Sequence, residues 1–416
     1  GFTPWGTYLT CEENFNGYFG TTSGVDGRDD SMKRYGISAR GTGYRWEEFD
    51  ERFDYAKEPN ESNRFGWVVE IDPFDPKSTP VKHTALGRFK HENCAYAFTA
   101  DRRVVVYMGD DQANDYIYKF VSDGRFVPGK DAANRRLLDH GKLYVAKFGN
   151  GAAAGDFMGN GEWVLLDKQA NPVLAADARF ADQAEVLIKT RLAADAVGAT
   201  KMDRPEWIAV NPRQAGEVYC TLTNNSDRGK DGKPGTDAAN PRNGNLFGHI
   251  MHWQENGSDA AALGFKWDIF VLAGRPDAAK AEHVGNIKGD AFGSPDGLTF
   301  DHNGVLWVQT DVSTSTVNMK EYKDMGNNQM VAVVPETGEF RRFLVGPKGC
   351  EITGLAFTPD MKTMFVNIQH PGEPDSERND PAKPTAISSW PDGPKAGRPR
   401  AGTVVVRKLN GGVIGS

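Results

Sequence analysis

HENCAYAFTADRRVVVYMGDD, residues 91–111, contains an acid, a short apolar strand, a polar turn, a second strand and a polar end. The same order recurs in RPEWIAVNPRQAGEVYCTLTNN (204–225), SPDGLTFDHNGVLWVQTD (294–311) and EITGLAFTPDMKTMFVNIQH (351–370). Two apolar runs around a polar turn are typical of a β-hairpin. A hairpin that recurs at uneven intervals with large insertions predicts an all-β fold, a β-propeller whose blades each place one hairpin toward a central channel.

The rest of the chain shows the same all-β character. Short runs rich in Val, Ile, Tyr, Trp and Phe alternate with turn residues, and 47 glycines and 23 prolines suit many tight turns. Helix-like spacing is confined to short stretches such as Asp182–Ala196. We interpret the polar segments Thr21–Arg64 and Asn224–Asn245 as long surface loops. No composition shift marks a domain boundary, so we predict a single propeller domain over residues 1–416.

Composition excludes several classes of protein. The chain has 416 residues, of which 39% are hydrophobic and 25% charged, an ordinary globular mixture. A net charge of -7 without a basic block gives no electrostatic footprint for nucleic acid. No apolar stretch approaches the roughly 20 residues of a membrane span, and the opening Gly1 and Phe2 carry neither Met nor the apolar core of a signal peptide. The four cysteines lack CxxC spacing, which excludes a zinc finger and leaves any disulfide pairing open.

An acid stands just before or at the start of the first strand in each repeat. These acids are Glu92, Glu206, Asp296 and Glu351. In a propeller they would converge on one axis, where like charges raise one another's pKa or require cations. Hard oxygen ligands suit Ca²⁺ or Mg²⁺, and a carboxylate-rich site also holds Fe³⁺ or Mn²⁺. For any single acid the alternative stays open that it is a turn former bonded to local backbone N–H groups.

TPWGTYLTCEEN, residues 3–14, matches the second strand of the repeat and ends in an unusual group of polar residues. Side chains alternate along a strand, so Cys11 and Glu13 share one face while Thr10 and Glu12 share the other. Only one of these pairs can face the channel.

The register of the repeat distinguishes the two glutamates. Glu13 aligns with Asp111 and Asn225, the last polar residues of other second strands. We therefore predict that Glu13 binds calcium and that Glu12 does not. The alternative is that both acids are solvated turn residues. We interpret Cys11 as a buried structural residue, because free cysteine is among the most buried residue types.

Several motifs, in order along the whole chain, resemble the PhoX-type alkaline phosphatases. They are TPWGTYLTCEENF (3–15), RPEWIAVNP (204–212), FGHIMHW (247–253), SPDGLTFD (294–301), EITGLAFTPD (351–360), NIQHPGE (367–373) and GGVIGS (411–416). The resemblance implies a six-bladed propeller, hydrolysis of small phosphomonoesters, and export by the twin-arginine pathway to the periplasm or beyond. It also implies a channel cluster of Fe³⁺ and Ca²⁺. The ligands would include Glu92, Glu206, Asp296 and Glu351, and Arg204 would face the substrate phosphate.

The sequence departs from the family pattern at one place. In the family a segment resembling Asn-Asn-Cys-Ala-Gly precedes TPWGT, and its cysteine is an iron ligand, whereas this chain begins after it. We therefore expect a propeller that is incomplete at its N-terminus and lacks that thiolate. For Arg204 the alternative is an ion pair with Asp203 or a surface position, and we assign Trp207 to packing between blades.

Two other function classes remain open at this point. A calcium-dependent propeller lactonase would also use channel carboxylates. A non-catalytic propeller would use its acids as stabilising calcium sites. We expect a monomer that binds neither nucleic acid nor membrane.

Overall fold

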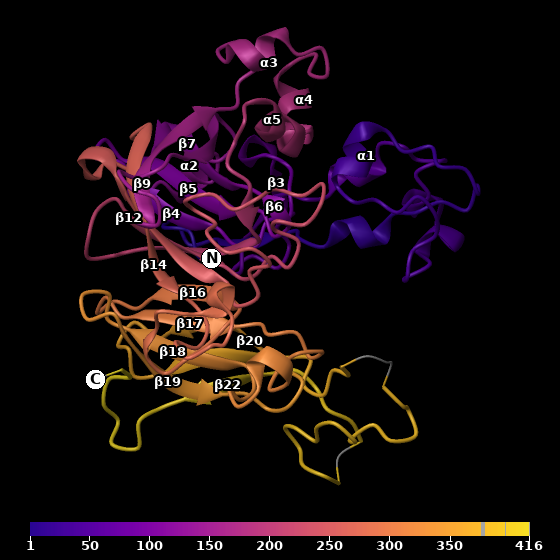
Figure 1. Ribbon diagram of the computed structural model, residues 1–416. Coiled ribbons are helices and arrows are strands. Elements are labelled where there is room, and N and C mark those ends of the chain that lie inside the picture. Colours follow the sequence, from indigo (N-terminus) through magenta and orange to yellow (C-terminus); the bar gives the residue numbers. More distant parts are fainter. Residues whose placement is uncertain (376–378, 396, 416) are drawn as a thin grey trace. The chain divides into compact units, whose positions relative to one another are not determined.

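The computed structural model describes residues 1–375, 379–395 and 397–415 and consists mainly of short β-strands (Figure 1). The few remaining positions of the predicted domain 1–416, including the last residue of GGVIGS, lie outside the described residues. The chain divides into a first unit, Gly1–Ile208 with Gln254–Trp267, and a second unit, Ala209–Trp253 with Asp268–Ser416. Helices are few and short, so the predicted all-β class is confirmed. No helix in the described part of the chain has the length and apolar character needed to cross a bilayer.

The first unit is built on antiparallel strands. These strands are β1 (Tyr8–Cys11), β2 (Val68–Ile71), β3 (Val81–His83), β4 (Ala95–Phe98), β5 (Arg103–Gly109), β6 (Ala113–Asp115), β7 (Ile117–Arg125), β8 (Gly141–Phe148), β9 (Met158–Leu165) and β10 (Met202–Asp203). β1, β2 and β3 form one sheet in that order. β4, β5, β7, β8 and β9 follow one another in a second sheet, and β6 pairs with β10.

The core of the first unit lies between this second sheet and a group of short helices. The helices of the unit are α1 (Asp30–Arg34), α2 (Asp131–Asn134), α3 (Pro172–Ala176), α4 (Gln183–Ile188) and α5 (Thr190–Ala196). Apolar side chains of β5, β7 and β8 join Val186 of α4 and Ala193 of α5 in one buried cluster. The predicted helical stretch is thus confirmed as two helices. Asp182 caps α4 by accepting the Glu185 N–H, and non-helical dihedrals at Lys189 separate α4 from α5.

The segment Thr21–Arg64 is more than the surface loop predicted. It contains α1 and three 3₁₀ helices, η2 (Trp46–Glu48), η3 (Glu51–Phe53) and η4 (Glu61–Arg64). Met32, Ile37 and Tyr55 form a small core with Phe19, which lies just before the segment. Widely spaced apolar residues in a polar sequence give no periodic signal, so the sequence did not reveal this core. We call residues 21–64 the insert; Figure 1 shows it in indigo around α1.

Most strands of the second unit, β12 excepted, form two largely antiparallel sheets. Its strands are β12 (Glu217–Leu222), β15 (Lys288–Gly289), β16 (Pro295–Phe300), β17 (Leu306–Thr310), β18 (Gln329–Val333), β19 (Glu339–Val345), β20 (Glu351–Phe357), β21 (Met364–Gln369) and β22 (Gly402–Val406). β16, β17, β18 and β19 lie side by side in that order, and β15 adds a short parallel pairing to β19 (Figure 1). β20, β21 and β22 form the other sheet. Trp307, Met330, Ile352 and Val366 belong to the core of this unit.

The predicted hairpins occur as strand pairs. β4–β5 in the first unit, and β16–β17 and β20–β21 in the second, are antiparallel neighbours. Three strands contribute residues to both units: β11 (Pro205–Val210), β13 (His249–Glu255) and β14 (Gly264–Leu272). The turn between β11 and β12 is closed by the Asn211 N–H, which donates to the Glu217 carbonyl at 2.9 Å. The segment Asn224–Asn245 has no helix or strand, yet it buries Arg228, Asn240 and Arg242, so it is not the purely surface loop predicted.

Candidate metal-binding and active site

Three carboxylates of the first unit meet at one end of the β4–β5 hairpin. Glu13, Glu92 and Asp111 each offer an oxygen, and these oxygens lie within 4.8 Å of one another. Glu92 precedes β4 and Asp111 follows β5, so antiparallel pairing brings both to the same end. The Asp111 N–H donates to the Lys90 carbonyl at 3.0 Å, which extends this pairing beyond the strands. We call these three residues the first acidic group.

The end of β5 closely approaches the start of β11. A Cβ atom on Gly109 would lie 2.3 Å from the carbonyl oxygen of Glu206, so only glycine fits there. Asn93 strengthens this approach, since its side chain donates to the Ile208 carbonyl and accepts the Ile208 N–H, both at 2.9 Å. Residues at the start of β11 therefore lie beside the first acidic group.

Arg204 lies at this junction and is held by two carboxylates. Its Nε and Nη2 donate to the two oxygens of Asp111 at 2.8 and 2.9 Å, and Nη2 lies 3.1 Å from Glu206. The residue has a φ of 58°, a left-handed conformation that is uncommon outside glycine. The Trp207 indole donates to Glu92 at 3.1 Å, so this side chain also contacts the acidic group rather than only packing between blades.

The first acidic group holds more negative charge than its neighbours neutralise. Burial, followed by the charge of Asp111, raises the pKa of Glu13 to about 8. Burial, with the charges of Glu13 and Asp111, raises the pKa of Glu92 well above its ordinary value. Burial alone would raise the pKa of Asp111, but the Arg204 guanidinium and nearby hydrogen bonds hold it below its ordinary value. A set of hard oxygen donors that repel one another fits a cation such as Ca²⁺.

Glu12 has a different environment from Glu13. Its Oε2 accepts the backbone N–H groups of Gly66 and Trp67 at 3.0 and 3.1 Å, and its Oε1 pairs with Lys82 at 2.7 Å. Strand β1 ends at Cys11, before both glutamates. The alternation of side chains along a strand therefore does not explain why Glu12 and Glu13 have different environments. Their partners distinguish them, because Glu12 is bonded to two backbone N–H groups and Lys82 whereas Glu13 faces other carboxylates.

The second unit contains an acidic group of its own. Asp296 in β16, Asp311 directly after β17 and Glu351 at the start of β20 offer oxygens within 4.8 Å of one another. We call these three residues the second acidic group. The Gln369 amide donates to Glu351 at 2.9 Å, and His370 Nε2 lies 3.5 Å from the same carboxylate. This contact with Glu351, although opposed by burial, raises the pKa of His370 to about 8.

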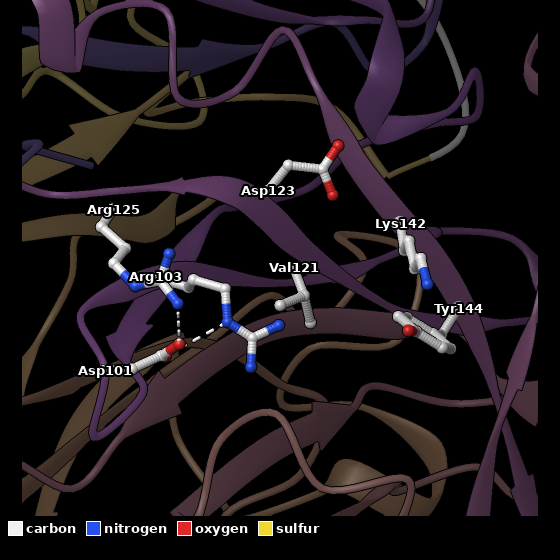
Figure 2. A pocket seen from close by; sticks show the side chains of 7 residues that line it. All are labelled: Asp101, Arg103, Val121, Asp123, Arg125, Lys142 and Tyr144. Carbon is white, nitrogen blue, oxygen red and sulfur yellow. Dashed lines mark hydrogen bonds and ion pairs between the residues drawn. The ribbon is translucent and has the colours of Figure 1, made fainter.

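A polar cavity on the first unit contains none of the predicted site residues. It has a volume of about 300 Å³ and is lined by Asp101, Arg103, Val121, Asp123, Arg125, Lys142 and Tyr144 (Figure 2). Asp101 pairs with Arg103 at 3.2 Å and with Arg125 at 2.8 Å, so one carboxylate serves both guanidinium groups. None of the carboxylate groups that could hold a metal among the described residues lies in this cavity, which makes it a weaker candidate for substrate phosphate than the junction at Arg204.

Comparison with known proteins decides the family. The family profile described as "Alkaline phosphatase PhoX" matches residues 1–372. The chain belongs to the PhoX alkaline phosphatase family. A solved structure, "Pseudomonas fluorescens PhoX in complex with vanadate, a transition state analogue", is 51% identical with a TM-score of 0.92, and the match covers 100% of this chain and 70% of that one. The protein is accordingly a phosphomonoester hydrolase, and the lactonase and non-catalytic alternatives are set aside.

Other comparisons add no information on function. A structure of PorZ, a surface component of the type-IX secretion system of Porphyromonas gingivalis, is 11% identical over 74% of this chain and 37% of that one, with a TM-score of only 0.24. No curated protein matches the sequence.

Family membership leaves the roles of individual residues as predictions. The structure brings Glu13 together with Glu92 in the first acidic group, and Asp296 with Glu351 in the second. Glu206 lies beside the first group, since its carboxylate pairs with Arg204 and has an oxygen within 4.8 Å of a Glu92 oxygen. Sequence reasoning did not propose Asp111 and Asp311 as ligands, although both occupy the polar end of a second strand. That position is the signal by which Glu13 was selected, and it could have found both aspartates.

Proposed function

We propose that the two acidic groups hold the metal cations with which this alkaline phosphatase hydrolyses phosphomonoesters, and that these cations are Ca²⁺ and Fe³⁺. The observation that carries the proposal is the uncompensated charge of the first acidic group, where burial and mutual repulsion raise the pKa of both glutamates. A protein that buries such charges without a cation loses stability, so the arrangement favours a bound ion. Proposed ligands are Glu13, Glu92, Glu206, Asp296 and Glu351, with Asp111 and Asp311 added.

Arg204 is the proposed phosphate-binding residue. Its guanidinium is a permanent cation whose N–H donors suit phosphate oxygens, and it lies among the acidic residues proposed to hold the metals. The carboxylates of Asp111 and Glu206 fix its orientation, so little side-chain entropy remains to be lost on binding phosphate. Bound cations polarise phosphoryl oxygens and lower the pKa of coordinated water. The vanadate complex of the relative, described as a transition state analogue, supports phosphoryl transfer as the chemistry.

Three wider features belong to the same proposal. The repeated hairpins and the family likeness support a six-bladed β-propeller. The likeness also suggests export to the periplasm or beyond. We expect the protein to act as a monomer on small phosphomonoesters.

Metal removal tests the proposal. Exhaustive chelation of the purified protein should abolish hydrolysis of p-nitrophenyl phosphate and lower the melting temperature, and Ca²⁺ with Fe³⁺ should restore both. A ligand that binds only folded protein stabilises it by about 2.7 kcal/mol at a hundredfold excess over Kd. Elemental analysis of protein before chelation should find both metals. Full activity in metal-free protein would overturn the proposal.

A further inference from the structure

Three aromatic rings gather on the insert and beside it. Tyr18 stacks on Trp46 with ring centroids 4.8 Å apart, and Tyr44 lies 5.3 Å from Trp46 and 5.9 Å from Tyr18. The Trp46 residue is nevertheless 40% exposed and Tyr44 is 61% exposed. We call these three residues the aromatic patch. Its rings contact one another while leaving a large apolar surface in solvent.

The loop that carries the patch is held in place by a buried carboxylate. Glu47 is only 2% exposed and accepts the backbone N–H and the hydroxyl of Thr42, at 2.8 and 2.9 Å. Arg45, which lies between Thr42 and Glu47 in the sequence, has a φ of 59° and pairs with Glu48. A carboxylate buried to fix an exposed loop, together with a left-handed residue, indicates a surface that is organised before any ligand arrives.

The patch also packs on the segment that follows the first acidic group. The 3₁₀ helix η1 (Phe15–Tyr18) begins two residues after Glu13 and ends in the patch residue Tyr18. A Cβ atom on Gly17 would lie 3.4 Å from the Tyr44 ring, so the loop lies directly against η1. Burial raises the pKa of Tyr18, with smaller contributions from Tyr44, Glu13 and Glu12.

We propose that the aromatic patch binds the flat aromatic group of a phosphomonoester whose phosphate lies at the first acidic group, as in a nucleoside monophosphate or an aryl phosphate. This inference rests on the proposed function for the position of the phosphate. Aromatic rings stack on any nucleobase with little sequence preference, because every base has a π-face. The patch therefore selects aromatic over aliphatic phosphomonoesters without discriminating among bases.

Substrate pairs test the patch. In Trp46→Ala and in Tyr44→Ala, the ratio of kcat/KM for AMP to kcat/KM for glycerol 2-phosphate should fall about tenfold, mainly through the KM for AMP. Trp46→Phe should recover part of the ratio, since it keeps a ring. Phe74→Ala is the matched control, because Phe74 is 86% exposed on the turn between β2 and β3, outside the insert. Its ratio should equal that of the parent.

A second measurement is independent of turnover. Adenosine carries the base without a phosphate. Its affinity for the parent, Trp46→Ala and Tyr44→Ala proteins therefore measures the contribution of the aromatic patch, even in metal-free protein. We expect both variants to bind adenosine about tenfold more weakly. Full phosphatase activity in metal-free protein, with adenosine binding weakened in both variants, would contradict the proposed function and leave the patch standing. An unchanged AMP ratio, or an equal fall for both substrates, in folded variants would overturn the patch.

Discussion

Two carboxylates of the first unit, the buried Glu255 and the half-buried Glu92, have opposite environments. Glu255 accepts hydrogen bonds from the Tyr107 hydroxyl at 2.8 Å, the Trp163 indole at 3.1 Å and the Lys119 ammonium at 3.2 Å. Glu92 accepts one from the Trp207 indole and otherwise faces acids. Glu255 is fully buried and Glu92 is half-buried, and they differ further in that Glu255 has a cationic partner. The difference supports the proposal that Glu92 binds a cation, whereas Lys119 neutralises Glu255 within the fold.

The largest expected effect comes from removing the cation beside Glu255. Lys119→Met leaves Glu255 buried without its cation, and removing one partner of a buried ion pair costs about 3–5 kcal/mol. Urea unfolding should show this loss, while kcat/KM of the folded protein stays near the parent value. Lys142→Met, at an exposed position on β8, is the control and should change stability by less than about 0.5 kcal/mol. Equal losses in the two variants would mean that Lys119 does not neutralise Glu255.

Beside the first acidic group, Arg204→Lys should reduce phosphatase activity without unfolding the protein. A lysine keeps the charge but loses the bidentate fork, so kcat/KM should fall about a hundredfold, the scale of losing a preorganised donor to developing charge. Vanadate inhibition should weaken in parallel. Arg125→Lys in the separate cavity should leave both quantities unchanged. Parent-level activity in Arg204→Lys would remove the arginine from the phosphate site.

A smaller effect should distinguish the adjacent glutamates. Glu13→Gln removes one hard donor from the first acidic group, and calcium titration calorimetry should show affinity weakened about tenfold. Glu12→Gln should leave calcium affinity nearly unchanged, because Glu12 is already bonded to Lys82 and two backbone N–H groups. If both variants bind calcium like the parent, residues 12 and 13 form only a turn.

The smallest effect concerns His252, which contacts two carboxylates and changes its charge with pH. Burial lowers the pKa of His252, but the hydrogen bond to Asp268 and the ion pair with Glu217 outweigh it and raise the pKa to about 9. Because the folded pKa exceeds the unfolded value near 6.5, the stabilisation is full below about pH 6.5 and is lost as pH rises through 9. His252→Gln should therefore be less stable than the parent by about 1–2 kcal/mol at pH 6, a value discounted for solvent at Asp268.

The pH dependence of that difference is the decisive part. Urea unfolding of the parent and His252→Gln should converge above pH 9. His302→Gln, in the exposed turn between β16 and β17, should follow the parent at every pH. A stability gap that is constant from pH 6 to 10 would show that His252 acts by packing rather than by charge.

The sequence predicted the parts of the site that repeat. An acid at a constant position in each hairpin led to Glu92 and Glu351, and the register led to Glu13, because short-range pattern determines which residues share a hairpin end. Pairs distant in sequence could not be predicted this way. Lys119 and Glu255 are separated by 136 residues and have no local signature. The insert was read as a loop because its core residues are few and irregularly spaced.

The most direct test of the uncompensated charge compares the melting temperatures of Glu92→Gln and the parent, in chelator and in Ca²⁺ with Fe³⁺, at pH 9. In chelator the variant should melt higher, because a neutral amide replaces a half-buried acid whose raised pKa makes ionisation costly in the folded state. With the metals the order should reverse, and the variant should lose most of its phosphatase activity. A variant that melts below the parent by the same amount in both conditions would contradict the account, since Glu92 would then stabilise the fold as Glu255 does.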